Sequence, residues 1–296
     1  MRKKLRAFII PLTVVLVITL IAVFGTSSVA NPGITSAVAE SPQFPAGSTM
    51  AKLHDEGALR VGTRYDHPGL SARNLKGQQE GFEIDMVEYI AAKLGLTPDQ
   101  IEWTEANSAN REQFLIQDKV DMVVATYTAS EKRKQVISFA GPYFDVHYDM
   151  VVAKGNPKHI TDPQTPSGVK VCSTVGGTVS VYTRKDFPDT NLIEFDVSSK
   201  CIEALKNGTV DALITHAPIG IGYVGQDPDD LQMAGASLSE EAWSIGIPKG
   251  DVTYCQWLDQ TIDEFYADGS AQKSWDDYLG KYSQLPIVKP QFAECT

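Results

Sequence analysis

The fold is decided by the stretch Val120-Asp121-Met122-Val123-Val124-Ala125-Thr126-Tyr127-Thr128-Ala129-Ser130-Glu131-Lys132-Arg133. Its apolar first half predicts a buried strand, and Ser130 predicts the N-cap of a helix after a polar turn. Lys132 and Arg133 fall in the first turn of that helix, where the partial positive charge of a helix N-terminus disfavours cations. A nearby anion would remove this conflict, and a solvated basic turn is the alternative.

Working outward, the chain before this stretch alternates strands and helices. Strands are predicted at residues 59–64 and 101–105, and helices at 81–96 and 111–118. Elements that alternate at these lengths indicate an α/β fold with a parallel, doubly wound sheet. Such sheets bind their ligands at the carboxyl ends of the strands.

Three arginines occupy that position. Arg64 ends the first strand, Arg111 begins the helix after the second, and Arg133 lies in the first turn after the third. Each alone would be interpreted as a surface ion pair, but together they should line one edge of the sheet. Guanidinium groups hold carboxylates through two parallel hydrogen bonds, so the sequence predicts a site for an anionic ligand.

The second half of the chain repeats part of the first. Residues 114–126 and 204–216 both predict a helix, a turn and a strand, and the match places His216 at the position of Thr126. A hydrogen-bonded structural histidine is the alternative. Between the halves, Gly176, Gly177 and Thr178 form a glycine-rich turn before a predicted helix, whose amides suit a carboxylate, although a plain tight turn has the same composition.

Composition narrows the class of protein. The 296 residues are 43% apolar, enough for ordinary cores, and the net charge of -11 disfavours nucleic acid as a partner. Residues 1–30, with a basic start and an apolar run over 7–24, predict a signal peptide, or an N-terminal anchor if it is not cleaved. Residues 31–49 predict a linker. The protein is therefore expected to be exported, in the periplasm or at the cell surface.

The four cysteines predict two disulfides. They form no Cys-x-x-Cys pair, and an exported chain meets oxidising conditions, so disulfides are favoured over metal or redox chemistry. Three connectivities are possible, and free buried thiols are the alternative. The sequential one keeps both bridges local, pairing Cys172 with Cys201 and Cys255 with Cys295.

Several segments then resemble a known family, the type 2 periplasmic solute-binding proteins of amino-acid ABC importers, and within it the glutamate/aspartate binders. The segments are Val61-Gly62-Thr63-Arg64-Tyr65-Asp66-His67-Pro68-Gly69-Leu70, Gly81-Phe82-Glu83-Ile84-Asp85, Ser130 to Arg133, Phe139-Ala140-Gly141-Pro142-Tyr143, Val210-Asp211-Ala212 and Gly246-Ile247-Pro248-Lys249-Gly250. The resemblance implies two α/β lobes joined by two crossover strands and closing around a ligand, a Venus flytrap. Lobe 1 would span 50–146 plus 243–296, and lobe 2 would span 147–242.

The resemblance also assigns roles to residues. Arg133 would hold the ligand α-carboxylate with Thr126 and Thr128. Arg64 and Arg111 would bind the side-chain carboxylate of the ligand, since relatives that bind cationic amino acids carry an acidic residue at the position of Arg64. The implied ligand-binding set is Arg64, Tyr65, Ser108, Arg111, Thr126, Thr128, Arg133, Gly176, Gly177, Thr178 and His216.

One departure from the family pattern is His216, where the family usually places an aspartate that pairs with the ligand α-ammonium. A neutral imidazole accepts a hydrogen bond but supplies no charge. The prediction is a monomeric binder of glutamate or aspartate that serves ABC permease subunits, with no cofactor and no metal. The alternatives are a dicarboxylate without an amino group, a cyclohexadienyl dehydratase-like enzyme with His216 as the base, and a tethered ligand sensor.

Overall fold

The computed structural model describes residues 42–283, 285 and 287–296. The predicted signal segment and residues 31–41 of the predicted linker lie outside these residues. Within them, no helix combines the length and the apolar character needed to cross a bilayer.

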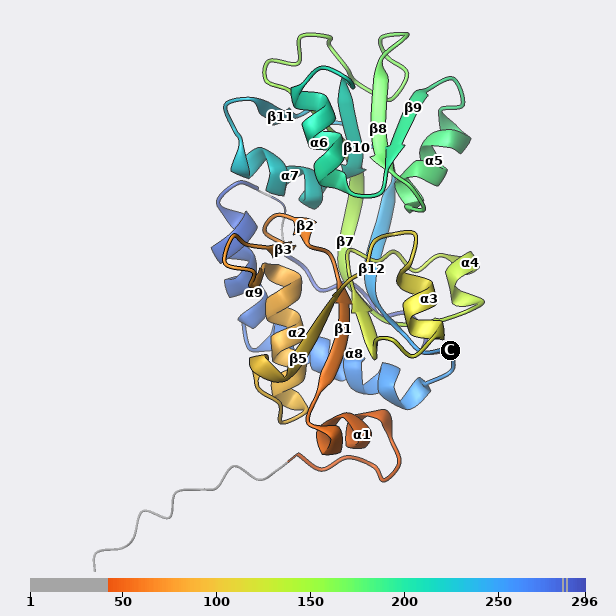
Figure 1. The fold of residues 1–296 in the computed structure, drawn as a ribbon, viewed down its shortest axis with the longest axis vertical. Helices are drawn as coiled ribbons and strands as arrows, with labels where there is room; N and C mark the ends of the chain where they lie inside the picture. Colours follow the sequence, from red (N-terminus) through yellow and green to blue (C-terminus); the bar gives the residue numbers. More distant parts are fainter. Residues whose placement is uncertain (1–41, 284, 286) are drawn as a thin grey trace, which may run out of the picture. The chain divides into compact units, whose positions relative to one another are not determined.

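The described chain forms two doubly wound α/β lobes joined by two crossover strands (Figure 1). The first lobe contains α1 (Thr49–Glu56), β1 (Leu59–Thr63), β2 (Asp66–His67), β3 (Ser71–Arg73), β4 (Gln79–Glu80), α2 (Phe82–Lys93), η1 (Pro98–Gln100), β5 (Ile101–Glu105), α3 (Arg111–Ile116), β6 (Met122–Val124) and α4 (Glu131–Lys134). The C-terminal α8 (Val252–Ala267), α9 (Ser270–Trp275) and η2 (Asp276–Gly280) pack on the same lobe.

The crossover strands are β7 (Ser138–Ala153) and β12 (Glu240–Ile247). The second lobe lies between them in sequence and contains β8 (Lys170–Thr174), α5 (Thr178–Asp186), β9 (Asn191–Phe195), α6 (Ser198–Lys206), β10 (Ala212–His216), α7 (Ala217–Gln226) and β11 (Leu231–Met233). Positions 147 and 243, the predicted boundaries of the lobes, lie inside β7 and β12. The boundaries themselves stay a prediction.

A continuous sheet runs through both lobes in the order β5-β1-β6-β12-β7-β10-β8-β9, and β11 pairs with β7. In the first lobe β1 is parallel to β5 and β6, and in the second β8 is parallel to β9 and β10. The crossover strands pair with each other and with their neighbours in antiparallel register. The carboxyl ends of the parallel strands in the two lobes therefore face one another across a cleft.

Helical periodicity explains how α2 covers the sheet. Met86, Val87, Ile90 and Ala91 are completely buried, at the i, i+1, i+4 and i+5 spacing of one helix face. They pack with β1 residues such as Val61, so the first parallel strand is covered on that side. The expected elements at 59–64, 81–96 and 101–105 are confirmed, each within a few residues of its predicted ends.

Both predicted disulfides are confirmed, and each lies in a different lobe. Cys172 of β8 is bonded to Cys201 of α6, and Cys255 of α8 is bonded to Cys295 near the C-terminus. They close loops of 29 and 40 residues in sequence separation. In a chain-entropy model, each contributes about 3 to 4 kcal/mol to the free energy of unfolding.

Candidate functional site

A small cavity lies in the cleft, at the facing strand ends of the two lobes. The residues of the predicted set that line it are Arg64, Ser108, Arg111, Thr126, Gly177, Thr178 and His216. Its volume is about 30 Å³. Ligand sites of ordinary size have roughly 300 Å³ or more, so an amino acid enters this cavity only if the surrounding lobes or side chains move.

A wider pocket of about 770 Å³ adjoins this cavity at the mouth of the cleft. Ser108, Gly177 and Thr178 line both spaces, so the two lie next to each other. Arg133 and Gly176 line the outer pocket and not the inner cavity. The predicted residues are thus brought together in one cleft, but at two depths.

Arg111, the first residue of α3, is a buried cation without a carboxylate partner in the described chain. Its side chain is almost fully buried, and Nη1 donates to the backbone oxygen of Ala125 at 2.8 Å. The guanidinium lies 3.8 Å from the ring centroid of Tyr127, while Nε has no hydrogen-bond acceptor among the described residues. Burial, reinforced by repulsion from Arg133, lowers the pKa of Arg111 to about 9. An anionic group would relieve this cost.

The other two arginines are already paired. Arg64 donates from Nε and Nη2 to Oδ1 of Asp66, at 2.9 and 2.6 Å. Arg133 donates from Nε to Glu112 at 2.7 Å, and its Nη atoms reach backbone oxygens of Thr128 and Gly176 at 2.9 and 3.0 Å. The bond to Gly176 crosses the cleft, so Arg133 holds the two lobes together.

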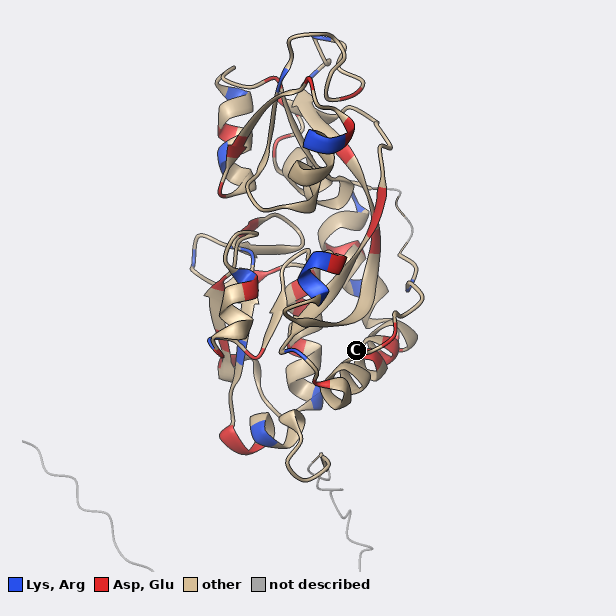
Figure 2. Cartoon of the chain, turned by 90° about the vertical axis from the view of Figure 1, so that its right-hand side faces the viewer, with Lys and Arg blue, Asp and Glu red and all other residues tan. Residues whose placement is uncertain are grey.

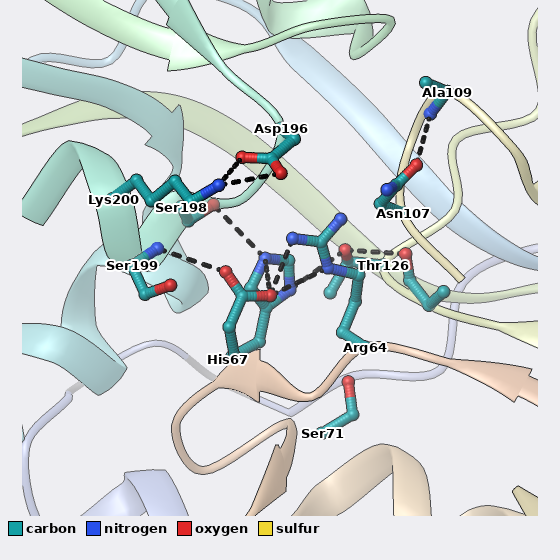
Figure 3. A network of polar contacts seen from close by, with 12 residues as sticks. Arg64, His67, Ser71, Asn107, Ala109, Thr126, Asp196, Ser198, Ser199 and Lys200 are labelled. Atoms are coloured by element: carbon teal, nitrogen blue, oxygen red, sulfur yellow. Dashed lines mark hydrogen bonds and ion pairs between the residues drawn. The ribbon is translucent and has the colours of Figure 1, made fainter. Parts of the chain in front are cut away.

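Asp66 also crosses the cleft. Its Oδ2 accepts from the backbone N–H of Ser199 at 3.1 Å, near the N-terminus of α6, and its backbone oxygen accepts from the hydroxyl of Tyr223. Burial alone would raise the pKa of Asp66, but the charge that His67 carries when protonated, the guanidinium of Arg64 and the Ser199 N–H lower it to about 2. Figure 3 shows Arg64 facing Ser199 across this contact.

His67 completes the cross-cleft network. Its Nε2 lies 3.3 Å from the hydroxyl of Ser198 in the second lobe, and its Nδ1 lies 3.3 Å from the hydroxyl of Thr126 in the first (Figure 3). Burial is the main cause that lowers the pKa of His67 to about 3, so the imidazole is neutral at pH 7. The sequence reasoning missed His67 and Asp66 as site residues, although both fall within the quoted segment 61–70.

His216 lines the inner cavity, but both of its ring nitrogens are engaged. The indole N–H of Trp243 is only a donor, so Nδ1 accepts from it at 3.4 Å. Nε2 therefore carries the proton and donates to Oε2 of Glu241 at 3.0 Å. Burial lowers the pKa of His216, which agrees with a neutral ring. In this tautomer the imidazole keeps no ring acceptor for a ligand.

Glu241 of β12 also belongs to the site, and it is the site residue that was hardest to identify from the sequence. Its Oε2 also accepts from the hydroxyls of Thr128 at 2.7 Å and Thr178 at 2.8 Å. Burial would raise the pKa of Glu241, but the bond from His216, the charge that His216 carries when protonated and the hydroxyl of Thr128 lower it to about 2. In the sequence Glu241 is one of two adjacent glutamates, and no motif distinguishes it from an ordinary solvent-exposed glutamate.

Two members of the predicted set do not line either space. Thr128 is buried and meets the cleft through Glu241. Tyr65 follows β1, but its ring faces the guanidinium of Arg73 at 5.5 Å from the centroid.

Figure 2 shows acidic and basic residues interspersed over both lobes, with acids along the crossover strands.

Comparisons with known proteins agree with this fold. Residues 59–281 match the family described as bacterial extracellular solute-binding proteins, family 3. The glutamate-binding protein GluB of Corynebacterium efficiens is 30% identical over 269 residues, which cover 88% of this chain and 91% of that protein. The glutamine-binding protein of Geobacillus stearothermophilus is 30% identical over 262 residues, covering 88% of this chain and 99% of the relative.

Among solved structures, the solute receptor for L-cysteine of Neisseria gonorrhoeae has a TM-score of 0.74 at 26% identity, covering 83% of this chain and all of that one. The family match spans most of the described residues and both halves of the cleft. The chain therefore belongs to family 3 of the bacterial extracellular solute-binding proteins.

Proposed function

We propose that this protein binds an acidic amino acid, glutamate or aspartate, outside the cytoplasmic membrane and delivers it to an ABC importer. The observation that carries the proposal is Arg111, a buried cation at the inner cavity with no carboxylate partner in the described chain. A ligand side-chain carboxylate would supply the missing charge and the acceptor for Nε.

The neighbours of Arg111 support the same ligand class. Ser108 lines the cavity beside it, and Arg64 lines the cavity while its guanidinium is held by Asp66. A distal carboxylate could share Arg64 with Asp66 or displace it. Relatives in the family are named for glutamate and for glutamine, which differ in the charge of the side chain. The property to test is therefore whether this end of the cleft prefers a charged ligand side chain.

We further propose that binding follows opening and closure of the two lobes about β7 and β12, with lobe 1 as 50–146 plus 243–296 and lobe 2 as 147–242. The 30 Å³ cavity supports this, because an amino acid cannot enter it without rearrangement. Arg133, through its bond to Gly176, would make closure tight for any amino acid whose α-carboxylate it also reaches. The protein would act as a monomer, and residues 1–30 would export or anchor it.

The decisive experiment is a calorimetric screen of the purified, ligand-stripped chain against the common amino acids and small dicarboxylates. We expect glutamate or aspartate to bind more tightly than glutamine and asparagine. Preference for an uncharged side chain would overturn the proposal. Incubation with prephenate in the same series tests the enzymatic alternative, because a dehydratase would release phenylpyruvate.

A further inference from the structure

We infer that Glu241 is the residue that binds the ligand ammonium, and that it therefore makes the protein select amino acids over dicarboxylates without an amino group. This inference rests on the proposed function and deepens it. It decides between the two possibilities that His216 left open, a ligand without an amino group and an ammonium held by another residue.

Glu241 stands where both lobes meet the ligand space. The carboxylate lines the outer pocket, and the hydroxyl of Thr178, which lines both the outer pocket and the inner cavity, donates to it at 2.8 Å. Thr128 donates to it from the first lobe at 2.7 Å, and His216 from the second at 3.0 Å. A group bound beside Thr178 is thus next to a carboxylate oriented by three protein donors.

Within residues 42–283, 285 and 287–296, no lysine or arginine balances the charge of Glu241. Its three partners are two hydroxyls and a neutral imidazole, and within the described residues no lysine or arginine nitrogen is paired with it. Of the other acids that meet the cleft, Asp66 is paired with Arg64 and Glu112 with Arg133, while Asp186 of the outer pocket is exposed to solvent. Glu83 is fully buried and receives hydrogen bonds from Ser71, Thr126 and Tyr143.

Arg111 and Glu241 therefore form two unmatched charges of opposite sign in one cleft. A dicarboxylate would satisfy Arg111 and leave Glu241 facing a second anion. An acidic amino acid brings a carboxylate for Arg111 and an ammonium for Glu241, so both charges are matched when water is excluded. The donors already on Oε2 fix the carboxylate in place before the ligand arrives, which lowers the entropy lost on binding.

The test compares L-glutamate with glutarate, which has the same carbon chain and both carboxylates but no amino group. Affinities for the two are measured by calorimetry on the whole chain, on Glu241→Gln and on Glu240→Gln. Glu240→Gln is the matched control, since it removes the same charge from the adjacent, exposed residue of β12. We expect Glu241→Gln to weaken glutamate about tenfold or more while glutarate is unchanged or strengthened. Glu240→Gln should leave the ratio of the two affinities unchanged.

Equal weakening of glutamate and glutarate by Glu241→Gln would overturn the inference. If Glu241→Gln does not fold, judged by its thermal unfolding, Glu241→Asp replaces it. This variant keeps the carboxylate on a shorter side chain. It should therefore keep more of the preference for glutamate over glutarate than the loss expected when the charge is removed.

A wild-type protein that prefers an uncharged amino acid would refute the proposed acidic ligand, but not this inference. The comparison is then made with the bound amino acid and its deaminated analogue. Binding of dicarboxylates alone would overturn the inference directly.

Discussion

On the first-lobe side of the cleft, Arg64, Arg111 and Arg133 follow the ends of β1, β5 and β6, whereas the second lobe contributes no charged residue to the inner cavity. Its strand ends present neutral groups, among them Thr174 and His216. The difference indicates a division of labour. It supports the proposal that the first lobe selects the charge of the ligand side chain, while the strand ends of the second lobe supply neutral donors and backbone that close over it.

The strongest test of this division removes the unpaired charge of the first lobe. Arg111→Met should weaken glutamate by about 2 to 5 kcal/mol, at least about thirtyfold in Kd, and glutamine much less. Without ligand, the free energy of unfolding should be unchanged or higher, because a buried cation without a carboxylate partner is replaced by an apolar side chain. Calorimetry and urea unfolding measure the two quantities.

Arg133→Met is the matched control, because Arg133 also lies near the ring of Tyr127 but is already paired with Glu112. It should weaken glutamate and glutamine by the same factor, through the lost bond to Gly176. If the Arg111 variant also affects both ligands equally, charge selection does not reside in the first lobe.

The cross-cleft contact of Asp66 gives the next largest effect, and it depends on pH. The pKa of Asp66 is lowered from 3.8 to about 2, so its contribution is complete above about pH 4 and is lost as the pH falls towards 2. The contribution is about 2 kcal/mol. Wild type should therefore lose that much more unfolding free energy than Asp66→Asn between pH 5 and pH 2. Parallel acid curves for the two proteins would contradict the assigned role.

On the second lobe, Gly176→Ala should weaken every ligand alike, by about tenfold. Gly176 has φ +78°, and an added Cβ would lie 3.0 Å from the backbone oxygen of Ser108 across the cleft. The control is Gly208→Ala, which has φ +76° but no atom within 4 Å of the added Cβ. Both should lower the melting temperature, but only Gly176→Ala should change Kd. A change in the ratio of glutamate to glutamine affinity would assign selection to the second lobe as well.

Much of the site could be predicted from local sequence. Alternating strands and helices indicate a parallel sheet, and the carboxyl ends of parallel strands meet at one edge, so Arg64 and Arg111 could be placed together without a structure. The internal similarity of 114–126 and 204–216 placed Thr126 and His216 on the same cavity, where both are found. Of the three possible disulfide connectivities, the sequential one that keeps both bridges local is the one present.

The sequence by itself determined which residue types reach the cleft, because strand ends and helix starts are set by local hydrophobicity and capping. Only the tertiary structure decided which charges remain unmatched there. Arg64 and Arg133 are paired with Asp66 and Glu112, whereas Arg111 has no carboxylate partner in the part of the chain that the structure describes. Glu241 contacts His216, which lies 25 residues earlier in the sequence. The contact forms because β12, which carries Glu241, pairs with β7, and β7 pairs with β10, which ends at His216. Charge pairing depends on distance in space between side chains, which spacing along the chain does not contain.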